Sequence, residues 1–478
     1  LKLYGEKKAL LNLNGVELTS KNGPAINNQC KKRLFVNLAS GTVNKLTDAA
    51  KYADDTYYLG GNTSADEDRK GCLFSEGNLV FSGNGSLIVA GKQKHGIASD
   101  GYMYVRPGVT IAVTEAAKNA IHIKGDKSDN IGIVVAGGLI YTLTESEAGK
   151  GMKTDYHVEV KGGQLDLNTK GDAVYDKDEN DTSSAAGIKT DGNVTITGGT
   201  ISIKSCGTGG KGINADGEIN FYGGKTTVVT TGGKYVYNAA LDLDSSPKGI
   251  KADGNITIDG GSVNILVAGV SDGSEGLESK ADMTINDGDV YVYAYDDAIN
   301  AAKSITVNGG RVYAYAANND GIDSNGTLTV NGGLVISNGS SAPEEAFDCD
   351  RSNDFKVNGG TLIGISGSAI SPASTSSQRT VIYNGLQMTK SETIAIISAD
   401  GKPVMTYTLP RSLNGSLFFS SGSLTNGSTY QVCSGGSVTN AAESWNGWYE
   451  GGSWSDGSTV GSFTVNGTVT TVGTSSGP

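Results

Sequence analysis

Two columns of acidic and amide side chains run through the middle of this 478-residue chain, and both follow the same changing spacing. The first column is Glu275, Asp297, Asp320 and Glu345, and the second is Glu278, Asn300, Asp323 and Asp348. Successive members are 22, 23 and then 25 residues apart in both columns. A repeat that keeps oxygen-bearing side chains in phase through changes in its own length predicts a stacked solenoid.

Stacked carboxylates also predict a bound cation. Neighbouring strands of a sheet lie about 4.8 Å apart, and two carboxylates about 5 Å apart repel each other by roughly 3 kcal/mol at an effective dielectric constant of about 20. Calcium takes 6–8 oxygen ligands from carboxylates, amide side chains and backbone carbonyls. We therefore expect Ca²⁺ to neutralise these columns.

The sequence offers oxygen ligands for up to three ions. The first expected set, from two successive repeats, is Asp297, Asn300, Asn319, Asp320 and Asp323, with Asp296 beside it. The second is Glu345, Asp348 and Asp350 together with Asp320 or Asp323, and the third is Glu275 with Glu278. Three histidines and five scattered cysteines form no cluster in the sequence, so we do not expect zinc.

An alternative explains the aspartates without a metal, because Asp and Asn readily form the turns of a solenoid. It accounts for Asp191, Asp216 and Asp253, which each belong to an Asp-Gly turn. It does not account for Glu275 or Glu345, because glutamate is not a turn former. Upstream repeats carry lysines in the same columns, at Lys150, Lys153, Lys211, Lys248 and Lys251. This change of sign distinguishes the acidic stretch as a candidate site.

The repeat that positions these columns is clearest in residues 187–203, 249–265 and 321–336. Each copy holds short runs of alternating β-branched residues between Asp-Gly, Asn-Gly and Gly-Gly turns, which is the pattern of strands with one buried face. Three strands in about 22–25 residues make one coil of an all-β parallel β-helix. A helical solenoid is excluded by the 70 glycines and by the lack of a 3.6-residue periodicity.

One apolar residue per coil anchors the repeat, and most anchors are 22 to 27 residues apart. The anchors are Ile97, Ile121, Met152, Ile188, Ile213, Ile250, Leu277, Ile299, Ile322, Phe347 and Ile370, with weaker copies around Ile26 and Cys72. Longer steps end at Met152, Ile188 and Ile250, and they leave room for polar insertions such as residues 176–184. The pattern predicts a solenoid over residues 1–374.

Residues 375–478 contain strand-like runs without the coil spacing and end in a stretch rich in Trp, Gly and Ser. The last coil of a solenoid exposes its core and unpaired strand edges, so it needs a cap. We expect this segment to form a small C-terminal β region that caps the solenoid.

Tyrosines alternate with small aliphatic residues in two successive coils. We expect the aliphatic residues to face the narrow interior and the tyrosines to face outward, stacked in pairs. The tyrosines are Tyr291, Tyr293 and Tyr295 in one coil, and Tyr313 and Tyr315 in the next. Two readings remain open: a sugar-binding platform beside the carboxylates, or cross-strand stacking that serves stability alone.

Charge and hydropathy limit the partner and the compartment. Residues 272–354 hold 15 acidic and 4 basic side chains, which makes nucleic acid an improbable partner for this surface. No apolar run approaches the length of a membrane span. We expect a monomeric, secreted or cell-surface protein whose signal peptide or lipoprotein anchor has been removed.

The coil motif Gly-Ile-Lys-x-Asp-Gly with Thr-Ile-x-Gly-Gly, together with residues 430–436, 448–452 and 460–465, resembles a bacterial family of secreted carbohydrate-binding domain-containing proteins. The resemblance covers nearly the whole chain. It implies a right-handed parallel β-helix, structural calcium and binding of plant cell-wall polysaccharides, notably acidic pectic chains.

Asn319-Asp320-Gly-Ile-Asp323, with Asp297 one coil before, is also similar to the calcium site of family 9 pectate lyases. In those lyases calcium bridges a uronate carboxylate, and a lysine of a later coil removes the C5 proton. The following coil of this chain offers Lys356 and Arg351. Lys356 belongs to an alternating strand pattern, and Arg351 has acidic neighbours in sequence, so neither is a clear base.

Three functions follow in order of preference. The first is calcium-dependent binding of acidic plant cell-wall polysaccharide, such as polygalacturonate, without cleavage. The second is a calcium-dependent polyuronate lyase that acts by β-elimination. The third is a cell-surface adhesin or structural solenoid without sugar specificity.

Overall fold

The structure is a computed structural model that describes residues 1–53 and 67–474. The chain divides into two compact units, residues 1–281 (unit 1) and residues 282–478 (unit 2). Regular structure is almost entirely β-strand, which confirms the predicted all-β class. Among the described residues, no helix is long and apolar enough to cross a membrane.

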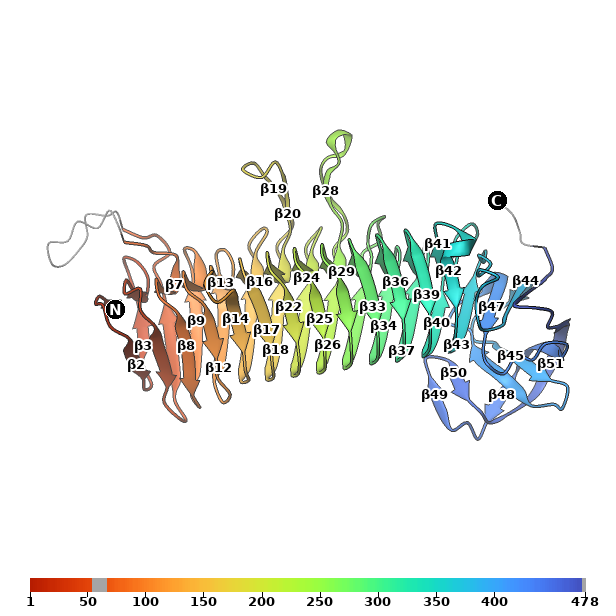
Figure 1. Ribbon diagram of the computed structural model, residues 1–478. Coiled ribbons are helices and arrows are strands. Elements are labelled where there is room, and N and C mark those ends of the chain that lie inside the picture. Colours follow the sequence, from red (N-terminus) through yellow and green to blue (C-terminus); the bar gives the residue numbers. More distant parts are fainter. Residues whose placement is uncertain (54–66, 475–478) are drawn as a thin grey trace. The chain divides into compact units, whose positions relative to one another are not determined.

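Unit 1 is a stack of coils, and each coil adds one strand to each of three parallel sheets (Figure 1). The first sheet consists of β1 (Lys2–Leu3), β4 (Ile26–Asn28), β7 (Gly71–Ser75), β10 (His95–Ser99), β13 (Ile121–Ile123), β16 (Lys150–Thr154), β21 (Ala186–Thr190), β24 (Lys211–Ala215), β29 (Lys248–Ala252) and β32 (Leu277–Ser279). The second sheet consists of β2 (Ala9–Leu13), β5 (Leu34–Leu38), β8 (Leu79–Gly83), β11 (Met103–Val105), β14 (Ile131–Val135), β17 (His157–Val160), β22 (Val194–Ile196), β25 (Ile219–Phe221) and β30 (Ile256–Ile258). The third sheet consists of β3 (Glu17–Thr19), β6 (Val43–Thr47), β9 (Ser86–Gly91), β12 (Thr110–Ala116), β15 (Leu139–Thr144), β18 (Gln164–Thr169), β23 (Thr200–Ser205), β26 (Lys225–Thr230) and β31 (Ser262–Val267).

The strand register of the first sheet confirms the predicted apolar anchors of unit 1. The paired, fully buried residues run through Ile97, Ile121, Met152, Ile188, Ile213, Ile250 and Leu277. One weaker copy is displaced by a residue, because Leu73 rather than Cys72 pairs with Ile26 and Ile97. Both Cys72 and Leu73 are buried and apolar, so hydrophobicity alone does not separate them.

Alternation and glycine turns explain the shape of each coil. In β23 the side chains of Ile201 and Ile203 are fully buried, whereas Lys204 is exposed. The Gly-Gly turn before β26 places Gly224 at a φ of +78°, where a side chain is strained. A Cβ on Gly224 would lie 2.7 Å from the carbonyl oxygen of Gly199 in the previous coil. Glycine at these turns therefore lets successive coils approach closely.

In the part of unit 1 that the structure describes, paired strands form two insertions, at the predicted long steps that end at Ile188 and Ile250. The first is a hairpin of β19 (Val174–Asp176) and β20 (Asp181–Ser183), and the second pairs β27 (Tyr235–Asn238) with β28 (Leu243–Ser245) around a short 3₁₀ helix, Ala239–Leu241. Both project from the same side of unit 1 in Figure 1. They contact each other through stacked Tyr175 and Tyr237 rings, whose centroids are 4.0 Å apart.

Unit 2 begins with the same kind of coil. Its first sheet holds β35 (Ile299–Ala301), β38 (Ile322–Ser324) and β41 (Phe347–Cys349). Its second sheet holds β33 (Asp282–Ile285), β36 (Ser304–Val307), β39 (Thr327–Val330) and β42 (Phe355–Val357). Its third sheet holds β34 (Asp289–Ala294), β37 (Arg311–Ala316), β40 (Leu334–Asn338) and β43 (Thr361–Ser366). The anchors Ile299, Ile322 and Phe347 are in register, as predicted, whereas Ile370 lies outside the strands and is only partly buried.

After β43 the strands of unit 2 become largely antiparallel. The third sheet continues into β47 (Leu413–Ser420), β44 (Thr380–Met388) and β52 (Val469–Val472). A separate six-stranded sheet holds β45 (Thr393–Ser398), β46 (Pro403–Thr408), β48 (Thr429–Thr439), β49 (Glu443–Trp445), β50 (Trp448–Glu450) and β51 (Ser453–Thr464). Antiparallel pairing of β47 with β43 covers the open edge of the last coil, which is how a cap protects a solenoid. The domain boundary at residue 375 itself stays a prediction.

Candidate functional site

The first acidic column of unit 2 is a hydrogen-bonded ladder. Asp297 Oδ1 accepts the backbone N–H of Asp320 at 3.1 Å, and Asp320 Oδ1 accepts the N–H of Glu345 at 2.5 Å. Glu345 Oε2 in turn accepts the N–H of Ile370 at 2.9 Å. Each carboxylate therefore binds the backbone of the following coil, which gives the column a structural role in addition to any role in binding.

The second acidic column lies beside the first on the strands of the first sheet. Asn300, Asp323 and Asp348 are paired in register on β35, β38 and β41. The Asn300 amide nitrogen donates to Asp297 at 3.1 Å and to Asp323 at 2.8 Å, so it links the two columns. The structure thus brings together four of the five residues expected to form the first ion site.

Burial and mutual repulsion raise the pKa values of the first column. Desolvation, followed by the charges of neighbouring carboxylates, raises the pKa of Asp297 and of Asp320 to about 7. Burial, followed by the charge of Asp348, raises the pKa of Glu345 to about 8. Within the described residues, no lysine or arginine forms an ion pair with Asp297, Asp320 or Glu345. The column is therefore crowded with acidic groups that lack a protein counter-charge.

The donor chemistry of this ladder suits calcium, because carboxylates and amide oxygens are its preferred ligands. Asp297 and Asp320 are only 5% and 9% exposed, so charge at these positions is costly without a cation. Among residues 1–53 and 67–474, no three His, Cys, Asp or Glu side chains converge closely enough to hold a metal. A bound ion would therefore require rotation of these side chains from the hydrogen-bonded positions described above.

Unit 1 places a lysine where the third ion was expected. The ammonium of Lys248 lies 2.8 Å from Glu275 and 3.1 Å from Glu278, and Lys280 also pairs with Glu278. Burial alone would raise the pKa of Glu278, but Lys248 and then Lys280 outweigh it and hold the pKa well below its ordinary value. Lysine supplies a counter-charge to Glu275 and Glu278, so these carboxylates do not need a metal ion for charge balance, and the third ion site stays a prediction.

The remaining predicted ligands lie at the edge of the ladder in unit 2. Asn319 donates its side-chain N–H to Asp296 at 2.8 Å, so this pair forms its own contact beside the column. Asp348 is partly buried and follows Asp323 in the register, whereas Asp350 is exposed at the end of β41. Asp350 is the least enclosed of the predicted ligands.

Neither basic residue considered for a lyase lies on the face of the ladder. Lys356 is exposed on β42, which belongs to the second sheet, whereas the ladder follows the first sheet. Arg351 is 79% exposed and its nearest ion-pair partner is Asp354, 3.8 Å away. The structure therefore gives no positional support to either residue as a base acting beside Asp320.

The tyrosine stacks form as predicted, but the cap covers one of them. Ring centroids are 5.0 Å apart for Tyr291 and Tyr313 and 4.9 Å for Tyr293 and Tyr315. Tyr313 is only 5% exposed and meets the edge of Trp445 in the C-terminal β region. Tyr313 is therefore not open to solvent, because the outward face of this sheet packs against the C-terminal strands.

The second tyrosine stack, Tyr293 on Tyr315, exposes less ring surface for a sugar than an open platform would. The guanidinium of Arg411 lies 5.4 Å from the ring centroid of Tyr315, and Tyr293 and Tyr295 are partly buried. Tyr291 and Tyr315 also pack against a hydrophobic cluster that includes residues of β40, β43 and the C-terminal strands β44 to β48. These contacts favour the interpretation that the tyrosines stabilise the fold over the interpretation that they form a sugar-binding platform.

From the sequence alone, the lysines of unit 1 are only a contrast to the acidic columns. In the structure they line a groove of about 810 Å³ on the first sheet. Lys153 and Lys189 are neighbours in one row of the register, which continues to Asn214 and Lys251. Lys211 and Lys248 are neighbours in a second row. The insertions β19–β20 and β27–β28 supply further lining residues.

The lysine rows could have been found from the same repeat that revealed the acidic columns. Each lysine of the second row stands two residues before an anchor, and each lysine of the first row stands one residue after it. Spacing does not show that two distant insertions meet over these rows. That information comes only from the tertiary contacts between the hairpins, such as Thr182 Oγ1 to the carbonyl oxygen of Asp244 at 2.8 Å.

Comparison with protein-family models gives one description for the chain, "Carbohydrate-binding domain-containing protein". The matched segments are residues 3–126, 110–234, 235–321 and 270–406, which overlap and together include both candidate regions. Comparison with curated proteins and with solved structures found no match.

Proposed function

Since this chain belongs to the carbohydrate-binding domain-containing protein family, we propose that it binds acidic plant cell-wall polysaccharide through calcium held by the carboxylate ladder of unit 2. The polymer would be polygalacturonate or a similar pectic chain. A calcium ion on the ladder would supply the attraction for a uronate carboxylate, which the uncomplexed acidic face would repel.

The observation that carries this proposal is the ladder of Asp297, Asp320 and Glu345. Three partly or fully buried carboxylates stand on successive coils, and their raised pKa values mark an unbalanced negative charge. In unit 1 the equivalent imbalance at Glu275 is balanced by Lys248. An external cation is the corresponding solution for unit 2.

Binding without cleavage is the preferred form of the proposal. β-Elimination needs a base at the sugar proton in addition to a cation that acidifies it. Lys356 is on β42 of the second sheet and Arg351 pairs with Asp354, so the lyase alternative lacks a positioned base on the ladder. An adhesin could use the same solenoid, but this alternative does not explain why Asp297, Asp320 and Glu345 are buried together without a described basic partner.

The proposed setting is outside the cell, where calcium and plant cell-wall polymers are available, and the proposed state is a monomer. These two points rest on the family resemblance and the composition of the chain. Chromatography of the full chain with light scattering would check the monomer.

The test is retention of the protein on immobilised polygalacturonate with calcium or with EDTA. We expect strong retention in calcium and clearly weaker retention in EDTA. The variant Asp320→Asn keeps an oxygen for the N–H of Glu345 but removes the charge, so it should weaken calcium-dependent retention about tenfold or more. Asp287→Asn removes an exposed carboxylate of the same unit and serves as the control.

Two results would contradict the proposal. Equal retention in calcium and EDTA would mean that no bridging ion is involved. Growth of the ultraviolet absorbance of unsaturated uronides would mean that the polymer is cleaved, and would replace binding by the lyase alternative.

A further inference from the structure

Three lysines of the unit 1 groove form no ion pair with any residue that the structure describes. Lys150 donates to Ser183 Oγ at 2.9 Å, and Lys211 donates to Ser184 Oγ and Ser245 Oγ at 2.6 and 2.7 Å. Among the described residues, neither forms an ion pair, and Lys153 beside them also forms none. Three ammonium groups therefore line the same groove, and the polar contacts described for Lys150 and Lys211 are to hydroxyl groups.

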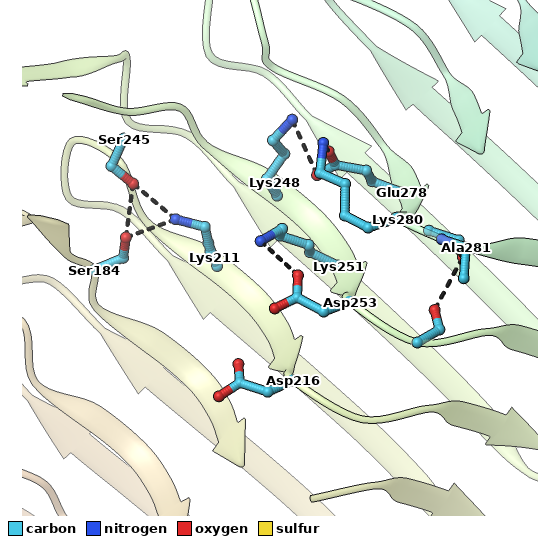
Figure 2. Close-up of polar contacts among 12 residues, drawn as sticks. Ser184, Lys211, Asp216, Ser245, Lys248, Lys251, Asp253, Glu278, Lys280 and Ala281 are labelled. Carbon is cyan, nitrogen blue, oxygen red and sulfur yellow. Dashed lines mark hydrogen bonds and ion pairs between the residues drawn. The ribbon is translucent and has the colours of Figure 1, made fainter. Parts of the chain in front are cut away.

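The other lysines of the groove are balanced by carboxylates. Lys189 pairs with Asp216 and Asp191, and Lys251 pairs with Asp253 at 2.9 Å. Figure 2 shows Lys251 directed to Asp253, while Lys211 is directed to the two serines. The unbalanced charge is thus local, and it is not a general property of this face.

Lys211 is held in place by the two insertions. Ser184 follows β20 and is 9% exposed, and Ser245 ends β28 and is 4% exposed. Their hydroxyl groups are also 2.7 Å from each other, so Lys211, Ser184 and Ser245 form a closed triangle of contacts (Figure 2). A charged group fixed by neutral acceptors is a ready partner for an incoming anion.

The hairpins give the groove walls that suit a sugar chain. Thr182, Ser183 and Ser246 offer hydroxyl groups, and Asp176, Asp181 and Asp244 offer carboxylate acceptors. Lysines bind the oxyanion of an acidic sugar, whereas hydroxyl and carboxylate groups bind its several hydroxyls. An acidic peptide would bring carboxylates without the ring hydroxyls that these wall groups can bind.

We propose that this lysine groove is a second saccharide site, in which Lys150, Lys153 and Lys211 bind the carboxylate or sulfate groups of an anionic sugar chain without a metal ion. The sugar part of this inference rests on the proposed function, whereas the position of the anion site rests on the unit 1 geometry. Unit 1 would then bind acidic glycans directly through lysines, whereas unit 2 would bind them through calcium held by carboxylates.

The proposal predicts that the affinity of the groove for an anionic sugar falls as the pH rises. Desolvation, followed by Lys251 and Lys248 on β29, lowers the pKa of Lys211 to about 7. Desolvation, followed by Lys153 and Lys189, lowers the pKa of Lys150 to about 8. The acidic groups that face these lysines are Glu278 on β32, Asp176 on β19, and Asp181 and Asp244 of the hairpins. Anion binding needs the charged lysines, so it should weaken as the pH rises through about 7 to 8.

The test measures binding of the full chain to oligogalacturonate and to dextran sulfate in EDTA, which removes the calcium-dependent mode. We expect one or both anionic glycans to bind and a neutral cello-oligosaccharide to bind much more weakly. The two anionic probes distinguish carboxylate from sulfate as the preferred group. Added salt should weaken binding, since the contacts are ionic.

Variants locate the site. Lys211→Met and Lys150→Met should each weaken EDTA-resistant binding about tenfold or more. Lys204→Met removes the same charge from an exposed position on β23 of unit 1 and should change little. Lys211→Arg keeps its charge at all relevant pH values, so it should bind at a pH where the wild-type protein has weakened. Lys150→Met still tests the groove if a Lys211 variant fails to fold.

Four results would overturn the proposal. They are complete loss of binding in EDTA, equal loss in Lys204→Met, a wild-type affinity that is constant over this pH range, and binding of polyglutamate as strong as that of oligogalacturonate. Loss of all binding in EDTA would leave the calcium-dependent function of unit 2 intact. EDTA-resistant binding alone, with no gain from calcium, would reject the unit 2 proposal and keep this one.

Discussion

Lys248 and Glu275 occupy the same position in two successive coils and form an ion pair of 2.8 Å. Each stands two residues before an anchor, and those anchors, Ile250 and Leu277, are paired in the register. The column therefore changes from lysine to acid at this point, and the first acid is neutralised by the last lysine. Within unit 1, the Lys248–Glu275 ion pair stabilises the stack and also marks where the lysine column gives way to the acidic column.

Replacing Lys248 should destabilise unit 1. Lys248→Met leaves Glu278, which is 0% exposed, with Lys280 as its only described basic partner. Removing one partner of a buried ion pair typically costs about 3–5 kcal/mol. Hydrogen exchange of β29 and β32 would measure the loss. Lys251→Met, whose partner Asp253 is exposed, should cost less than about 1 kcal/mol; an equal effect of both variants would contradict this account.

Calcium should stabilise the protein more at high pH than at low pH. The folded-state pKa values of Asp297, Asp320 and Glu345 lie above those of unfolded carboxyl groups. A raised carboxyl pKa gives stability that is present at low pH and is lost as pH rises through about 4 to 8. Melting temperatures with EDTA should therefore fall over this interval, and calcium should restore them. A calcium effect that is the same at both ends would exclude these carboxylates as ligands.

Asp320→Asn should have opposite effects on stability and on calcium binding. The amide oxygen keeps the hydrogen bond from the N–H of Glu345, while the negative charge beside Asp348 and Glu344 is lost. In EDTA at about pH 8, thermal unfolding should shift upward by a gain on the order of 1 kcal/mol. Calorimetric titration should show weaker calcium binding. A variant that is destabilised in EDTA would mean that the aspartate charge is already balanced.

Lys211→Met should stabilise unit 1 at neutral and low pH. The folded-state pKa of Lys211 is below that of an unfolded lysine, so protonation opposes folding below about pH 7, and this penalty disappears above about pH 10. The gain should be on the order of 1 kcal/mol, since Ser184 and Ser245 lose a partner. Chemical unfolding at about pH 7 and at about pH 10 would measure the difference in stability. A loss of stability at both pH values would contradict the idea that the charge on Lys211 opposes folding.

Tyr313→Ala should loosen the C-terminal β region more than it changes sugar binding. Tyr313 is 5% exposed and packs with residues of β43, β44, β46 and β47. Truncation of a buried aromatic residue costs about 3–5 kcal/mol. Limited proteolysis after about residue 375 would detect the change. Tyr295→Ala, at a partly exposed position, should remain resistant, and a protease-resistant Tyr313→Ala would show that the cap does not depend on this contact.

The sequence predicts the coils well because their signal is local and repeated. The anchors Ile188, Ile213 and Ile250 are in register because each coil must bury the same apolar position, and the Gly-Gly turns fix the length between strands. The displaced copy at Cys72 is an exception with a simple cause, since Leu73 beside it is equally apolar and buried.

The sites are less predictable because their contacts join distant segments. Alternation correctly orients the tyrosines away from the coil interior, but it does not reveal that Trp445 and Arg411 cover that face. The column spacing identifies Glu275 and Asp297 as equivalent positions. Lys248 of the previous coil pairs with Glu275, however, so Glu275 does not need an external cation for charge balance. The serines that hold Lys211 come from two separate insertions, and no local pattern links them.

The two hairpins have a consequence for how such a protein can diversify. Each leaves and rejoins the stack between coils, and the register on either side, such as Thr154 with Thr190 and Ala215 with Ala252, is uninterrupted. The coils therefore supply the stability, while the inserted segments are free to change in length and composition. A solenoid of this kind could acquire a new ligand preference by exchanging one loop, without any redesign of its core.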